Sequence, residues 1–142
     1  MKTIVLMVIS ILLFISRIKS TPLLINKNKY TTLMEAKERE MIANQTNYSK
    51  YAIDGSIVIA LFLSLLFAVY YVMIANMRIS IYVTIFSILQ IVLTVYPDIY
   101  VVRYLSTHNP KDLVPSRILY VFNGIVDYIY YPLVIWFLIQ LL

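Results

Sequence analysis

The sequence predicts an all-α integral membrane protein, a helical bundle with three or four transmembrane helices. Three observations predict it. Of the 142 residues, 61% are hydrophobic and only 13% are charged, whereas soluble domains have roughly 45–50% and about 25%. Three largely apolar runs are each long enough to cross a bilayer, and most basic residues lie between the runs. A soluble domain of this length has too little interior to bury so many apolar side chains.

The three long runs predict the helices of a membrane bundle. They cover residues 56–76, 79–96 and 118–142, and a spanning helix needs about 20 residues. The first two runs are separated by little more than Met77 and Arg78. We therefore expect these two helices to form a tight antiparallel hairpin.

Two prolines mark expected irregularities in these helices. Pro97 should stop or kink the second helix, because proline has no amide proton and its ring clashes with the preceding turn. Tyr96, Tyr100 and Tyr104 then recur every four residues, which predicts a short interfacial helix with an aromatic stripe. Pro132 should kink the last helix.

Residues 1–20 allow three interpretations. About 13 apolar residues follow Lys2, which is the layout of a cleaved signal peptide. Asn-X-Ser/Thr triplets at 44–46 and 47–49 would suit a segment exported by such a signal. The charge distribution favours an uncleaved signal-anchor with both termini outside, because ten Lys and Arg residues then face the cytoplasm and only Lys2 and Arg78 face outward. A third possibility places residues 1–20 on the membrane surface.

Residues 21–55 form a polar, partly helical loop. Residues 31–45 are rich in helix formers, and Glu35 precedes Arg39 by four residues, a spacing that stabilises helices. This segment is either a weakly amphipathic helix on the membrane surface or on a partner, or a solvated linker. The chain thus divides into residues 1–20 (signal peptide or signal-anchor), 21–55 (polar loop) and 56–142 (membrane bundle).

The first helix of the hairpin carries a stripe of small side chains. Ser56, Ala60, Ser64 and Ala68 follow one another at four-residue steps. In lipid there is no hydrophobic drive between helices, and small residues allow the close approach that van der Waals packing needs. The stripe indicates packing within the hairpin or, alternatively, docking of a different protein.

One carboxyl group lies inside the predicted spans. Asp127 shares a face of the last helix with Asn123. Because a charge at this depth costs about 2.5–3.5 kcal/mol on insertion scales, it should face protein or a water-filled cavity. Gln90 is the expected partner, since antiparallel helices bring it to a similar depth. The buried polar set of Gln90, Asn123 and Asp127 indicates structural hydrogen bonding, recognition of a partner helix, or ion handling.

Three features of the sequence speak against transport and enzymatic chemistry. We find no second charge at the depth of Asp127, and glycines that could interrupt a helix are limited to Gly55 and Gly124. Catalytic motifs and cysteine are absent, and the only pairing of a base with an acid is His108 with Asp112 in a proline-containing loop. We therefore expect no catalytic, cofactor-binding or metal-binding residues, and the basic loops indicate membrane topology and no nucleic-acid binding.

Residues 56–142 combine tyrosine- and isoleucine-rich spans with a basic loop before a proline-containing last helix. The positions that carry this pattern are Pro97, Tyr100, Tyr104, Asp112, Tyr120 and Pro132. In this plan the chain resembles the small immunity proteins that protect bacteria from pore-forming colicins. The spacing departs from theirs by gaps, and residues 1–20 have no counterpart. The resemblance implies binding of an incoming toxin or entry protein in the membrane.

The sequence therefore predicts a non-enzymatic multi-pass membrane protein that acts through protein–protein contacts in the bilayer. It would be an accessory or assembly subunit, or a virus- or phage-encoded membrane protein, and its partners would be lipid and other membrane proteins or further copies of itself. The alternatives are an oligomeric ion pore or holin-like protein lined by the Asp127 face, and the immunity or exclusion protein implied by the resemblance.

Overall fold

The computed structural model describes residues 2–47, 50–109 and 116–142, with side chains described outside 45–53. Within these residues the chain is helical and contains no strand, which confirms the all-α prediction. The helices are α1 (Lys2–Lys19), α2 (Thr21–Ile25), α3 (Lys27–Asn47), α4 (Lys50–Asn76), α5 (Ile81–Thr107) and α6 (Arg117–Gln140). By length and composition three of them can cross a membrane: α4 from Asp54 onward, α5 and α6.

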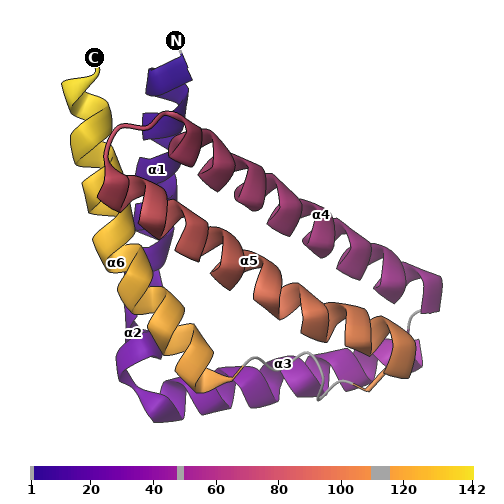
Figure 1. The fold of residues 1–142 in the computed structure, drawn as a ribbon. Helices are drawn as coiled ribbons and strands as arrows, with labels where there is room; N and C mark the ends of the chain where they lie inside the picture. The colour runs from indigo at the N-terminus through magenta and orange to yellow at the C-terminus, as the bar shows by residue number, and fades with distance from the viewer. Residues whose placement is uncertain (1, 48–49, 110–115) are drawn as a thin grey trace.

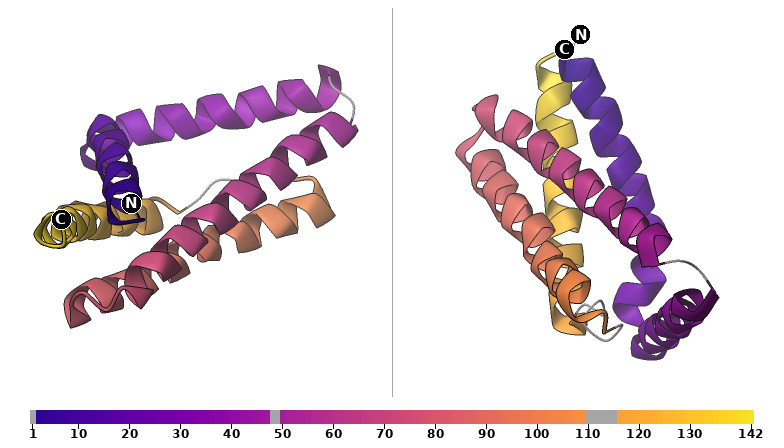
Figure 2. Two further views of the ribbon diagram at one scale, coloured as in Figure 1. Left: turned by 90° about the horizontal axis from the view of Figure 1, so that it is seen from above. Right: turned by 90° about the vertical axis from the view of Figure 1, so that its right-hand side faces the viewer.

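The helices form two antiparallel pairs that are joined at one end and diverge toward the other (Figures 1 and 2). α4 packs mainly on α5, and α1 packs mainly on α6. The start of α1, the end of α6 and the α4–α5 turn meet at what we call the terminal end, and α3 lies across the opposite end, the α3 end (Figure 1). α4 and α5 have 27 residues each, more than a bilayer needs, and long spans accommodate the excess by tilting.

The hairpin of α4 and α5 is as tight as the sequence predicts. α4 ends at Asn76 and α5 begins at Ile81. Arg78 reverses the chain by adopting a left-handed conformation with φ of 50°. Ser80 then caps α5, because its hydroxyl oxygen accepts a hydrogen bond from the Tyr82 amide.

α5 does not stop at Pro97, and the separate interfacial helix predicted after it is not formed. The helix continues through Pro97 to Thr107, so the tyrosine stripe belongs to α5. α4 supports the chain on both sides of the proline: Ser64 donates hydrogen bonds to the Thr94 carbonyl (3.3 Å) and to the Asp98 carboxylate (2.7 Å). Contacts of this kind from a neighbouring helix allow proline inside membrane helices. Pro132 likewise lies inside α6, which continues to Gln140.

α1 and α2 together accompany α6 along its length, further than the first apolar run indicates. The α1 helix ends at Lys19, the helical conformation is interrupted at Ser20, and α2 continues in the same general direction (Figure 1). α2 packs so closely on α6 that a Cβ added to Gly124 would lie 2.5 Å from Leu24 Cδ2. Alanine at Gly124 would therefore force the Leu24 side chain to shift.

The predicted helix within residues 31–45 is confirmed and is longer than expected. α3 is capped by Asn26, whose side-chain oxygen accepts hydrogen bonds from the backbone amides of Asn28 and Lys29. The exposed Glu35–Arg39 pair spans 3.9 Å. α3 lies nearly across α1 and α6 (Figure 1).

A dry core of buried side chains holds α1, α4, α5 and α6 together near the terminal end. It is built from Leu6, Tyr70, Tyr71, Ile74, Val83, Tyr130, Tyr131, Val134 and Leu138. Its tyrosine hydroxyls pair across helices: Ser10 with Tyr70 at 2.6 Å, Tyr71 with Tyr131 at 2.8 Å, and Ser87 with Tyr130 at 3.0 Å. Because lipid supplies no hydrogen bonds, such pairs fix the helices to one another.

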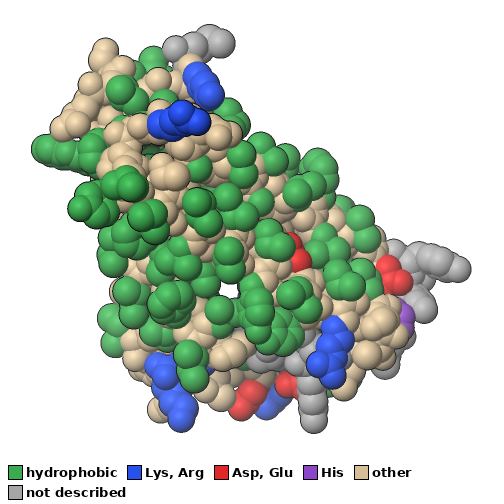
Figure 3. Space-filling view, viewed as in Figure 1, with side chains coloured by type: hydrophobic (Ala, Val, Ile, Leu, Met, Phe, Trp, Pro, Cys, Tyr) green, Lys and Arg blue, Asp and Glu red, His purple; other side chains and the backbone are tan. Residues whose placement is uncertain are grey.

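The surface also has the distribution of a membrane protein. Figure 3 shows hydrophobic side chains over most of the visible flank, with basic side chains above and below them. The exposed hydrophobic residues include Ile59, Phe62 and Ile85, each with more than half of its surface area accessible. Together with the three candidate spans this supports a multi-pass membrane protein.

Candidate functional site

The most unusual polar cluster contains Arg17, Gln90 and Asp127, contributed by α1, α5 and α6. Arg17 Nε lies 2.6 Å from Asp127 Oδ2, and both side chains are about nine-tenths buried. Gln90 Nε2 donates a hydrogen bond of 2.5 Å to the other carboxylate oxygen, Oδ1. One carboxylate oxygen thus forms an ion pair with Arg17 and the other accepts a hydrogen bond from Gln90, the contact predicted from the sequence.

Arg17 is positioned by the last turn of α1 and by an aromatic ring. A cation in this turn is favoured by the helix dipole. The guanidinium lies over the Tyr120 ring, with 5.3 Å between Cζ and the ring centroid, a favourable cation–π geometry. Its Nη1 is also 3.5 Å from the Ser20 hydroxyl, at the break between α1 and α2.

The ion pair lies well inside the predicted membrane segment. Asp127 is ten residues from Arg117 at one end of α6 and 13 from Gln140 at the other. At about 1.5 Å per residue these separations are about 15 Å and about 20 Å. A bilayer core about 30 Å thick would therefore enclose the pair.

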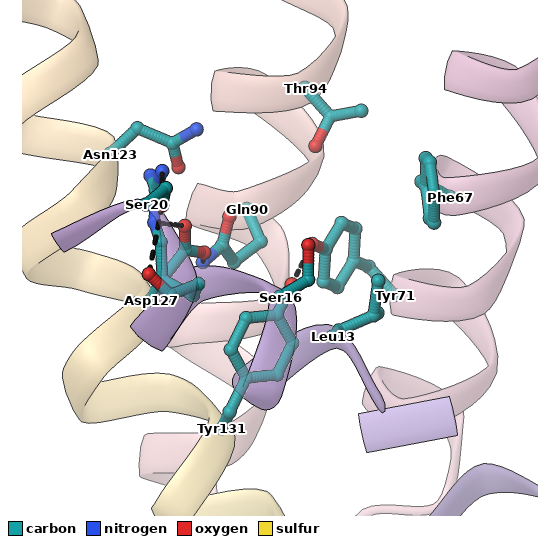
Figure 4. A pocket seen from close by; sticks show the side chains of 11 residues that line it. Leu13, Ser16, Ser20, Phe67, Tyr71, Gln90, Thr94, Asn123, Asp127 and Tyr131 are labelled. Atoms are coloured by element: carbon teal, nitrogen blue, oxygen red, sulfur yellow. Dashed lines mark hydrogen bonds and ion pairs between the residues drawn. The ribbon is translucent and has the colours of Figure 1, made fainter. Parts of the chain in front are cut away.

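An open cleft of about 330 Å³ surrounds this cluster, where the two helix pairs diverge. α1, α4, α5 and α6 all contribute to its wall (Figure 4). Its polar lining consists of Ser16, Arg17, Ser20, Tyr71, Gln90, Thr94, Asn123, Asp127 and Tyr131, and its apolar lining of Leu13 and Phe67. In Figure 4 Asn123, Gln90 and Asp127 lie on one side of the cleft and Phe67 on the opposite side.

Asn123 gives the cleft an unmet hydrogen-bonding group. Its Oδ1 is buried and has no hydrogen-bond partner among the described residues. A buried acceptor without a donor destabilises a fold by about 1–3 kcal/mol.

The structure brings the predicted buried polar residues together but separates the small-residue stripe. Gln90, Asn123 and Asp127 all line the cleft. In the stripe, Ala68 is buried and Ser64 is half-buried against α5, whereas Ser56 and Ala60 are exposed. Only the end of the stripe nearest the terminal end therefore packs within the hairpin.

Two sequence inferences about the site are wrong. Arg17 is a second buried charge, and the first helix is interrupted at Ser20 beside the cleft. Both were missed because the basic residues were taken as the end of a short apolar run. The available signal was Thr21–Ile25, a short apolar segment with a proline, which continues the packing on α6 beyond Lys19.

Groups suited to other chemistry are scarce in the part of the chain that the structure describes. No cluster of three or more metal-ligating side chains is found among those residues. His108 Nδ1 lies 3.9 Å from Asp54 Oδ1, joining the end of α5 to the start of α4. Asp112, which follows His108 by four residues in the sequence, is outside the described residues, as are residues 48 and 49 of the second Asn-X-Ser triplet.

Comparisons of the chain with protein families, with curated proteins and with solved structures find no match. The function is therefore argued from the residues of this site.

The ion pair predicts a specific pattern of stability. Asp127→Leu should lower the free energy of unfolding by about 3–5 kcal/mol, because it leaves Arg17 charged and buried without a partner. The double variant Arg17→Met with Asp127→Leu should lose less than the single variant. Unfolding in mixed micelles measures both.

The matched control is Lys19→Met, which removes an exposed cation at the same helix break and should change stability by less than about 0.5 kcal/mol. Additive losses from Arg17→Met and Asp127→Leu would contradict the pairing.

Proposed function

We propose that this chain is a non-enzymatic multi-pass membrane protein that acts by contact with other membrane proteins, and that the Arg17–Asp127 cleft receives a polar group of the partner. The observation that carries the proposal is a polar cleft, open between two helix pairs, at membrane depth.

Lipid is a poor occupant for this cleft. Hydrocarbon tails offer no hydrogen bonds to the polar side chains that line the cleft. Unsatisfied polar groups cost several kcal/mol in the bilayer core. The occupant must therefore be polar: a side chain of a partner helix, or water.

The packing at the terminal end favours a partner helix in the cleft over a water-filled path through a single chain. Val83, Tyr130, Val134 and Leu138 of the dry core have no exposed area, and these residues lie between the cleft and the terminal end. The cleft thus ends blindly toward that side. A partner helix with polar side chains can supply hydrogen bonds to a cleft that is closed at one end. Ion conduction, in contrast, requires a route that is open on both sides.

Cross-linking tests this proposal directly, because the chain has no cysteine. A benzophenone attached to Asn123→Cys should give a discrete protein adduct in native membranes, since this position lines the cleft. The matched control is Ile125→Cys, on a different face of α6. Its side chain is 55% exposed, so this variant should give lipid adducts. Protein adducts of equal yield at both positions, or none at Asn123, would sink the proposal.

We further propose that the chain is a signal-anchor protein with its terminal end outside. Of 12 Lys and Arg residues only Lys2 and Arg78 belong to the terminal end, and cytoplasmic loops carry the basic excess. Single cysteines test the orientation: Arg78→Cys should react with a membrane-impermeant thiol reagent, and Asn44→Cys and His108→Cys should be protected. The reverse pattern, with loss of residues 1–20 from the mature mass, would indicate a cleaved signal peptide.

Ion handling is the second candidate, favoured by the buried ion pair beside an interrupted helix. Since one chain is blocked at the terminal end, a pore would need several copies. It predicts an ion leak in liposomes that Asp127→Asn changes; liposomes that stay tight with the wild-type chain would count against it.

A further inference from the structure

A second cavity, a crevice between α1 and α4 at the terminal end, is lined mostly by apolar side chains, unlike the polar cleft. Its volume is about 360 Å³. One wall is formed by Val5, Leu6 and Ile9 of α1, and the other by Leu66, Val69 and Met73 of α4. Each set follows helical spacing along one face, so the two walls run parallel to their helices.

The crevice has an almost entirely apolar surface. Leu6 and Tyr70 form its floor with only 2% and 5% of their area exposed. The Tyr70 hydroxyl is engaged by the Ser10 hydroxyl at 2.6 Å, so it offers little to a ligand. The surface therefore suits hydrocarbon and gives no hydrogen bonds to a polar molecule.

The crevice runs along the two helices and has room for part of one acyl chain. From Lys2 to Ile9 it extends about 10 Å at about 1.5 Å per residue. Its walls on both helices are apolar along this length, as an extended hydrocarbon chain requires.

Lys2 places a positive charge at the mouth of the crevice. It is the one charged residue in the lining. Acidic residues are absent from the described part of the terminal end, which carries the basic residues Lys2 and Arg78. Lysine at the ends of membrane helices extends its ammonium group toward the lipid headgroups. An anionic phosphate would thus meet attraction and no like charge.

We propose that this crevice binds one phospholipid of the leaflet at the terminal end, with an acyl chain between α1 and α4 and its phosphate on Lys2. The site is separate from the Arg17–Asp127 cleft, and the lipid would fill the space that α1 and α4 leave between them. It would thereby complete the contact between the two helix pairs.

Native mass spectrometry of the full chain, purified in detergent with phosphatidylglycerol, tests the proposal. The wild-type chain should retain one lipid molecule after annular lipid is washed away. Val69→Trp should abolish retention, because the indole fills the crevice from a position that is already 48% exposed. Lys2→Glu should weaken retention by about fivefold or more, the effect of one basic residue at an anionic surface.

Two control variants separate this site from general lipid contact. Leu65→Trp lies on α4 outside the crevice and is 58% exposed, and Arg78→Glu changes a charge at the same end; both should retain the lipid. Equal retention in all variants, or none in the wild type, would overturn the proposal. A dimer that Val69→Trp dissociates would overturn it too, by naming a second copy as the occupant. If Val69→Trp does not fold, unchanged retention in Lys2→Glu overturns it alone.

Discussion

The structure depends on the contact between Arg17 and Asp127. A lone charge in hydrocarbon costs about 2.5–3.5 kcal/mol on insertion scales, and here the two opposite charges lie 2.6 Å apart. Gln90 occupies the remaining carboxylate oxygen. These three residues belong to α1, α5 and α6, and their pairing fixes how far the first helix descends along the last. Removing one partner would leave a buried charge, which is why the contact constrains the fold more than an apolar contact of the same size.

The two ends of the molecule differ in how their polar groups are satisfied. Near the terminal end, three hydroxyl pairs join α1, α4, α5 and α6 within a dry core, and the donors and acceptors are matched within the chain. Toward the α3 end the helix pairs diverge around a cleft with a polar lining, and Asn123 Oδ1 is buried there without a hydrogen-bond partner among the described residues. The hydroxyl pairs of the core thus set the helix positions at the terminal end, whereas the ion pair does so beside the cleft.

The sequence predicted the parts of this arrangement that follow from length, depth and composition. The three long spans, the tight hairpin at Arg78 and the Gln90–Asp127 contact all follow from counting residues along antiparallel helices. Arg17 could not be found in this way, because its role depends on α2 continuing past a break that reads as the end of a run. The contacts of Ser64 beside Pro97 join residues far apart in the chain, so they could not be read from local sequence. The tyrosine core was likewise unpredicted, since tyrosine is as common at membrane interfaces as between helices.

Residues 21–25 continue down α6 and hold Arg17 at the level of Asp127. A disulfide tests this most directly, because the chain lacks cysteine and Leu24 lies against Gly124. Oxidation of the double variant Leu24→Cys with Gly124→Cys in native membranes should give an intramolecular disulfide, whereas Leu24→Cys with Phe122→Cys, an exposed position on α6, should not. Failure of the first pair, or equal yield from both, would mean that α2 does not pack on α6 and that Arg17 is not held at the depth of Asp127.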